Sequence, residues 1–397
     1  MADDAAFWKK SLKNFERMKW MMSNIGIETS TWGVRFYVSL FGVVYQVIMT
    51  YTNLFVNIND IEYVLAILMD SVGLLTSAFC LGSLSYYNDS IITIIEVMKN
   101  QCHPRHYKHA KEREVLEKYN LVIDTLFTIA TYYLVPYLCL VCIIPVLSRL
   151  SDASSVDSSV NSSVTSSSKT YPLPLDLYQL YHINNEWTYF LSFIFIALLL
   201  VNNTFIRVNI DFLYILTIFH LCGQISLLSS RIENLSTSDP RALQKDLGLV
   251  INHHNQIIWM NKRISSIFSF YLAAFLLTST FLLCLTNYQG LVNMQRGNYV
   301  VGTRCFVCTF VISGMVFVNC LLGNFLVVES RNLERAFYDC LWYNAPAAFQ
   351  RIILMCLKQS QTSLNLNAGG FTIVSLATLT AVMKTSVGYL SLLRAVI

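Results

Sequence analysis

Long apolar runs separated by polar links dominate the hydrophobic pattern of this chain. Each run is long enough to cross a hydrocarbon layer about 30 Å thick as a helix of about 20 residues. The pattern therefore predicts seven membrane-spanning helices, at residues 33–55, 64–86, 121–147, 187–206, 265–288, 302–328 and 371–393.

Positive charge is distributed unevenly over the links between these runs. Twenty of the 28 Lys and Arg residues lie in the N-terminal segment and in the links after the second, fourth and sixth runs. Cytoplasmic loops retain Lys and Arg, so these segments are expected inside the cell. Seven crossings then place the C-terminus outside, which is the reverse of a G-protein-coupled receptor. We expect an all-α integral membrane protein with seven transmembrane helices, a cytoplasmic N-terminus and an extracellular C-terminus.

The fourth and fifth runs are expected to continue beyond the membrane as helices. No proline occurs between Pro174 and Pro240, and the helical pattern of the fourth run extends to about Leu235. A helix of about 47 residues rises roughly 70 Å, more than twice the hydrocarbon thickness. Such extensions need partners, so we expect a cytoplasmic helical anchor bundle. The expected units are a cytoplasmic segment 1–31, helices one to six in 32–328 with cytoplasmic extensions 207–263, an anchor helix in 329–370, and the last helix in 371–397.

Two segments outside the spans have a distinctive composition. The stretch FWKKSLKNFERMKWMM near the N-terminus is amphipathic, and it predicts a helix either in the membrane interface or packed on the cytoplasmic bundle. The outer loop 150–186 is rich in serine and is expected to be flexible. Asn161 begins an Asn-Ser-Ser sequon in this loop and is the expected glycosylation site. The following YPLPLDLYQLYHINNE predicts an ordered outer lid.

Composition argues against a soluble enzyme. Hydrophobic residues make up 54% of the chain and charged residues only 13%, against about a quarter charged in ordinary domains. No phosphate-binding glycine loop, HExxH motif or nucleophile elbow is present, so we expect no enzyme activity, no cofactor and no nucleic-acid partner. Packing is favoured over metal binding for the Cys305–Cys308 pair, as is a solvated surface for His103, His106 and His109.

The last run has one face with a graded character. At about 100° per residue, Thr378, Thr385, Tyr389, Leu392 and Val396 fall within about 40° of one face. This face is polar or small and then becomes apolar, as a pore that closes by dewetting requires. Packing against another span is the alternative. Because a pore lined by one helix per chain needs several chains, the pattern also implies an oligomer.

Asp70 and Lys384 lie well inside predicted spans, where charge is costly. Lys384, near the middle of the last run, requires a buried partner or a water-filled path. Asp70, in the second run, either contacts a neighbouring helix or takes part in binding a ligand or ion.

The outer halves of several spans are rich in aromatic residues and methionine. Small-molecule sites are mostly apolar clefts with a few polar groups, often between helices of a bundle. The pattern favours a volatile or lipophilic ligand, although each residue alone is also explained by lipid contact or core packing. The candidate ligand-binding residues are Met69, Asp70, Gly73, Tyr132, Tyr133, Pro136, Tyr137, Tyr189, Phe193, Phe306 and Phe310.

An ordered series of segments begins at Glu329: ESRNLERAFYDCLWYN, then RIILMCLKQSQ, then LNAGGFTIVSLATLTAVMKTSVGYLSLL. The stretches HLCGQISLLSSRIENL and YPLPLDL precede it. Together these segments resemble the insect odorant receptor family. The resemblance covers nearly the whole chain in outline, with specific motifs mainly in 220–235 and 329–393.

The resemblance implies an odorant-gated, non-selective channel for monovalent and divalent cations, embedded in the lipid of the plasma membrane of olfactory sensory neuron dendrites. Such channels are tetramers of an odorant-tuned subunit and a co-receptor, with the last helix around a central pore. The family's gate would map onto Leu392 and Val396, and its ligand pocket onto the outer halves of spans two, three, four and six. The short link between the fourth and fifth spans indicates a tuning subunit, because the co-receptor carries a long insertion there.

Three other classes remain as alternatives. A gustatory-type chemoreceptor would carry a TYxxxxxQF-like motif in its last span, where this chain has KTSVGYLSLL. A G-protein-coupled receptor is opposed by the cytoplasmic N-terminus. A transporter is disfavoured because the sequence shows no internal repeat.

Overall fold

The computed structural model describes residues 2–28, 31–59, 61–103, 107, 110–157, 173–175, 177–178, 185–235 and 240–396. Helices account for nearly all of this part of the chain. They are α1 (Ala2–Ile25), α2 (Val34–Val56), α3 (Ile61–Tyr86), α4 (Asn88–Gln101), α5 (Ala110–Asp157), α6 (Glu186–Glu233), α7 (Pro240–Gln295), α8 (Tyr299–Asp339), α9 (Ala347–Ser360) and α10 (Leu376–Val396). Two short antiparallel hairpins are formed by β1 (Ile27–Glu28) with β2 (Thr31–Trp32) and by β3 (Asn367–Ala368) with β4 (Thr372–Ile373).

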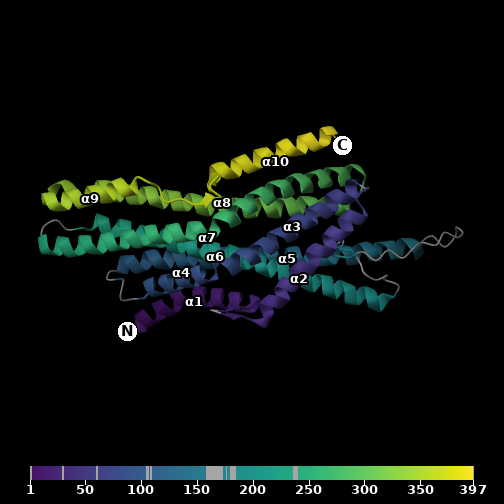
Figure 1. The fold of residues 1–397 in the computed structure, drawn as a ribbon, viewed down its shortest axis with the longest axis horizontal. Coiled ribbons are helices and arrows are strands. Elements are labelled where there is room, and N and C mark those ends of the chain that lie inside the picture. Colours follow the sequence, from purple (N-terminus) through teal and green to yellow (C-terminus); the bar gives the residue numbers. More distant parts are fainter. Residues whose placement is uncertain are drawn as a thin grey trace.

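The helices run along one long axis, with the N-terminus towards one end and the C-terminus at the other (Figure 1). Helices α1, α4 and α9 lie towards the end that holds the N-terminus, which we call the cytoplasmic end. Within the described residues, six helices are long and apolar enough to cross a membrane, namely α2, α3, α6, α7, α8 and α10. Helix α5 contains the third predicted span, 121–147. The all-α, seven-helix membrane fold expected from the sequence is confirmed.

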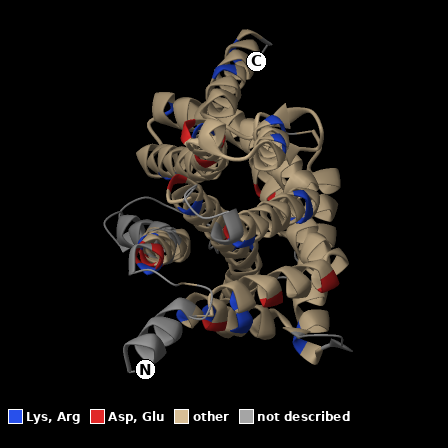
Figure 2. Ribbon diagram, turned by 90° about the vertical axis from the view of Figure 1, so that its left-hand side faces the viewer, with Lys and Arg blue, Asp and Glu red and all other residues tan. Residues whose placement is uncertain are grey.

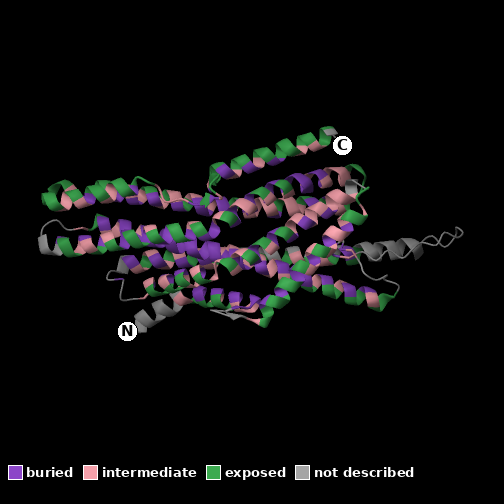
Figure 3. Ribbon diagram, viewed as in Figure 1, coloured by how far each residue is buried: buried purple, intermediate pink, exposed green. Residues whose placement is uncertain are grey.

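Helices α6 and α7 are continuous over a greater length than the predicted spans 187–206 and 265–288. Helix α6 has 48 residues and α7 has 56. The start of α6 is fixed by Asn185 and Thr188, because the Thr188 hydroxyl lies 3.2 Å from the Asn185 amide, which donates to it. From Phe212 to Ile225 every residue of α6 is buried. Buried positions are dense in this cytoplasmic half and sparser in the membrane half (Figure 3).

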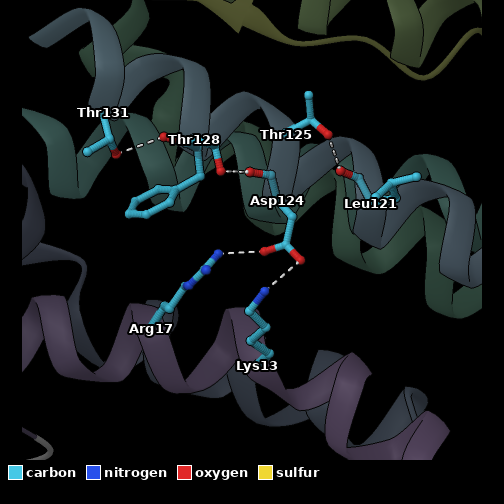
Figure 4. A network of polar contacts seen from close by, with 8 residues as sticks. Lys13, Arg17, Leu121, Asp124, Thr125, Thr128 and Thr131 are labelled. Carbon is cyan, nitrogen blue, oxygen red and sulfur yellow. Dashed lines mark hydrogen bonds and ion pairs between the residues drawn. The ribbon is translucent and has the colours of Figure 1, made fainter.

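Helix α1 packs on the cytoplasmic bundle, which decides between the two predicted positions of the N-terminal segment. Its residues Phe15, Met18 and Ile25 are buried in the main core. Asp124 of α5 accepts hydrogen bonds from both Lys13, at 3.2 Å, and Arg17 (Figure 4). An apolar stripe and a double ion pair therefore hold α1 against the bundle.

Two element boundaries differ from the sequence prediction. Helix α5 continues to Asp157, so the first residues of the serine-rich segment are helical. Extending a formed helix adds one hydrogen bond per residue, and no proline interrupts this stretch. Helix α10 begins at Leu376 instead of residue 371. Gly369 and Gly370 both have positive φ, so the preceding residues form the β3–β4 turn.

Candidate functional site

The β3–β4 hairpin fixes the start of α10 against two other helices. The Gly369 amide donates to the Ser269 carbonyl of α7 at 3.0 Å. Gly323 of α8 faces Val374 so closely that a Cβ there would lie 2.3 Å from the Val374 carbonyl oxygen. Only glycine allows this approach. The inner end of α10 is thus held by α7 and α8.

One face of α10 is covered by α7 and α8. It includes Thr378, Val382 and Ser386, which are at most 8% exposed. The Thr378 hydroxyl donates to the Ile373 carbonyl at 2.6 Å, back towards the hairpin. This corrects the assignment of Thr378 to the open face, because the helical period gives spacing but not which side the neighbours cover.

The opposite face of α10 is open in this chain. Most of its exposed positions are small, polar or charged, namely Ala377, Thr380, Ala381, Lys384, Gly388, Ser391 and Ala395, while the apolar Val387 is 64% exposed beside them. Thr385 and Leu392 are exposed at the border between the two faces, and Tyr389 next to them stacks on Phe281 of α7 with ring centroids 6.1 Å apart. Lys384 is exposed, so burial within this chain does not explain it. Val396 ends the helix, and its side chain lies outside the described residues.

Several predicted ligand-binding residues come from α3, α6 and α8. Met69, Asp70 and Gly73 of α3 are half-buried, and a Cβ on Gly73 would meet no atom within 4 Å. Cys305 of α8 is buried, and the neighbouring Phe306 is 36% exposed and packs against Gly290 of α7.

Tyr189 and Phe193, both on α6, have ring centroids 6.1 Å apart, and Tyr189 is buried. The remaining predicted ligand-binding residues lie elsewhere. Tyr132, Pro136 and Phe310 are exposed, and the side chains of Tyr133 and Tyr137 lie outside the described residues. The structure adds a contact that the sequence pattern did not reveal, because the Thr286 and Thr309 hydroxyls are 2.9 Å apart between α7 and α8.

The remaining predictions concern glycosylation and metal binding, and one cavity lies apart from the predicted ligand site. Asn161, His106 and His109 lie outside the described residues. No group of three His, Cys, Asp or Glu residues suited to a metal occurs in the part of the chain that the structure describes. A cavity of about 400 Å³ lies in the cytoplasmic half and touches none of the predicted ligand-binding residues.

Comparison with known proteins identifies the family. The chain matches the family model described as 7tm Odorant receptor over residues 83–387, well over half of its length. The chain belongs to the odorant receptor family. This confirms the resemblance seen in the sequence, and the family consists of receptors rather than enzymes.

Curated relatives in the family align with less than half of the chain. Odorant receptor 13a of Drosophila melanogaster is 28% identical over 197 residues, 45% of this chain and 46% of that protein. Odorant receptor coreceptor of Ooceraea biroi is 27% identical over 144 residues, 36% of this chain and 30% of that protein. The chain spans less than half the length of these relatives.

Solved structures of the insect olfactory receptor OR5 from Machilis hrabei share the fold. One has a TM-score of 0.74 at 14% identity and covers 96% of this chain and 97% of that chain. Its complex with eugenol has a TM-score of 0.78 at 14% identity and covers 98% and 100%. The chain is therefore a multi-pass membrane protein with the odorant receptor fold.

Proposed function

We propose that the chain is the odorant-specific subunit of a ligand-gated, non-selective cation channel. It binds a small volatile or lipophilic molecule in the outer half of the bundle and assembles with a co-receptor into a heterotetramer. Its place is the plasma membrane of olfactory sensory neuron dendrites, and it passes monovalent and divalent cations through a pore lined by α10. The open face of α10 is the observation that carries this proposal.

That face is unsuited to lipid. Helix α6 exposes Phe190, Leu191 and Leu198 in its membrane half, as a lipid-facing helix does. Helix α10 instead exposes Lys384 with small and polar neighbours, and a lysine at the centre of a membrane helix costs about 2.5–3.5 kcal/mol. Four such faces around a shared axis would line a wettable path, with Leu392 at its apolar constriction.

Assembly with another subunit is supported by a second surface. Large apolar side chains are exposed at the cytoplasmic end, both in the segment after α8 (Leu341 and Tyr343) and in α9 (Leu354 and Met355). A large apolar patch in contact with water is typical of a protein interaction site. We assign residues 329–370 to an anchor that meets the neighbouring subunits. Curated relatives include several odorant receptor coreceptors, and the short link between the end of α6 at Glu233 and the start of α7 at Pro240 favours the tuned partner.

The ligand site is proposed in the outer half of the bundle, near Asp70, Tyr189 and Phe306. The related Machilis hrabei receptor has been solved with eugenol, which supports a small lipophilic ligand of the same kind here. Such a ligand opens the channel only if it binds the open arrangement more tightly than the closed one.

The direct test is whole-cell current from this chain expressed with a co-receptor. Leu392→Ser is expected to raise the resting current several-fold, because a hydroxyl wets the constriction. Leu191→Ser on α6 is the matched control, since Leu191 and Leu392 are 64% and 61% exposed.

Lys384→Gln should increase inward cation current, because a positive charge is removed from the path.

Unchanged resting current and odorant response in both α10 variants would refute the pore assignment. An odorant response that requires intracellular GTP would instead favour the G-protein-coupled alternative. A response that continues without GTP and needs both subunits supports the channel.

A further inference from the structure

A polar cavity lies between α4, α6 and α7 at the cytoplasmic end of the molecule. Its volume is about 400 Å³, within the range of about 300–1,000 Å³ that small-molecule sites occupy. Figure 2 looks onto this end of the bundle, where charged positions of both signs are visible. The floor of the cavity is formed by Tyr107, Gln224, His253 and Arg231.

The floor is a hydrogen-bond chain with a defined direction. Gln224 Nε2 donates to the Tyr107 hydroxyl at 3.4 Å, and that hydroxyl donates to the Gln101 carbonyl at 2.7 Å. Gln224 Oε1 must then accept from His253 Nε2, which lies 3.0 Å away. His253 Nδ1 is left to accept from the Arg231 guanidinium at 3.5 Å. Each floor group therefore has a fixed role before any ligand enters.

Among the described residues that line the cavity, Arg231 is the one charged side chain and none is Asp or Glu. Burial, reinforced by Arg231, lowers the pKa of His253 to about 3, so this imidazole is neutral in the cytosol. Glu112 lies behind Arg231 and accepts from its Nε at 2.8 Å, which orients the guanidinium. A planar guanidinium matches the geometry of carboxylate and phosphate groups.

The rim adds hydrogen-bonding groups without charge. Asn100, Asn252 and Gln256 are exposed at the mouth of the cavity and carry carboxamides that donate to electron-rich oxygens. Leu227 and Leu249 supply apolar wall for the body of a ligand. The cavity thus combines one oriented cation, several neutral donors and an apolar surface that is larger than the polar one.

We propose that this cavity binds a metabolite-sized organic anion from the cytosol, with its phosphate or carboxylate group at Arg231 and the rim carboxamides. The source is soluble and not a lipid headgroup. Arg231 lies 25 residues beyond Ile206, the last residue of the predicted span, which is about 37 Å along a helix. The headgroup layer is only about 7 Å deep on each side of the hydrocarbon core. Occupancy would join α4 to the two helices that continue into the membrane.

The test uses the full chain in nanodiscs, with glucose 6-phosphate and citrate as probes and glucose as the neutral control at matched ionic strength. Isothermal titration and the thermal unfolding temperature report binding, since a ligand that binds the folded state stabilises it. At least one anion is expected to bind and to raise the unfolding temperature, and glucose is expected to do neither.

A pair of variants on α7 separates the site from general ion effects. Asn252→Asp places a negative charge at the rim and is expected to weaken anion binding at least about tenfold. Asn255→Asp adds the same charge at an exposed position that does not line the cavity, and it should change binding less than about twofold. Absence of binding by both anions overturns the proposal, and so does an equal loss in the two variants.

Discussion

The two halves of α6 differ in how many of their residues are buried, although the helix is continuous. In the membrane half, buried residues recur every three or four positions, at Tyr189, Ser192, Ile196, Leu199 and Asn203. In the cytoplasmic half, every residue from Phe212 to Ile225 is buried. Both stretches are predominantly apolar in sequence, so the difference comes from the surroundings and not from hydrophobicity.

The two halves of α6 differ in burial because one is surrounded by lipid and the other by water. Lipid is as apolar as a leucine side chain, so an outward-facing leucine in the membrane gains little from protein contact. In water the same side chain must be covered by neighbouring helices, and its burial is worth about 1.5–3 kcal/mol. The cytoplasmic half therefore carries most of the packing energy. The membrane half has fewer buried positions, and it is where the ligand site is proposed.

The largest expected effect compares the same substitution in the two halves. Leu228→Ala should lower the free energy of unfolding by about 3 kcal/mol, because Leu228 is 0% exposed and its loss leaves a cavity. Leu198→Ala should cost less than about 1 kcal/mol, because Leu198 is 63% exposed and faces lipid. Thermal unfolding in nanodiscs measures both. Equal losses would remove the distinction between the halves.

Acid should weaken the cytoplasmic half selectively. Burial lowers the pKa of both His220 and His253 to about 3, below the ordinary value of 6.5. The unfolded chain therefore binds more protons than the folded chain below pH 6.5, and stability is lost as the pH falls from 6.5 towards 3. At pH 5 the loss is about 2 kcal/mol for each histidine. Arg231, Glu112 and His254 also act electrostatically on His253.

Unfolding as a function of pH checks this expectation. His253→Gln removes one of three buried histidines with a lowered pKa, the others being His220 and His254, so it should reduce the loss of stability between pH 7 and pH 5 by roughly a third to a half. An unchanged pH profile in this variant would assign the acid sensitivity to other groups.

The smallest expected effect concerns the edge of the cytoplasmic half, where α1 is attached. Asp124 is 25% exposed and pairs with Lys13 and Arg17, so Asp124→Asn should cost about 1 kcal/mol, as a partly screened pair does. Hydrogen exchange in α1 should accelerate. Glu114→Gln, at an exposed position of the same helix, serves as the control. Equal protection of α1 in both variants would mean that the apolar stripe alone holds it.

The continuous features of the fold were predictable from the sequence. Helix α6 was expected to end near Leu235 and ends at Glu233, because no proline or charge block interrupts the helical pattern. Helix α7 was expected from about Arg241 and begins at Pro240. Long apolar periodicity is the strongest signal that a sequence carries.

Features that depend on contacts between distant segments were not predictable. The β3–β4 hairpin has strands of only two residues, too short to show a strand period. The open face of α10 could not be oriented, because the helical period does not say where α7 and α8 lie. The hydrogen bonds that run from Arg231 through His253 and Gln224 to Tyr107 join α6, α7 and the loop after α4. The hydrophobic pattern of the sequence does not indicate that these residues meet.

The cytoplasmic part of α6 also has a consequence for biogenesis. Residues 187–206 and 212–225 are two successive apolar stretches, and a translocon that scans the nascent chain meets both. Arg207 and Asp211 separate them, and a charged residue at the centre of an inserting helix costs about 2.5–3.5 kcal/mol. These two residues are therefore expected to limit insertion to the first stretch. Neutralising both is expected to draw the second stretch into lipid and away from α5, its packing partner in the folded chain.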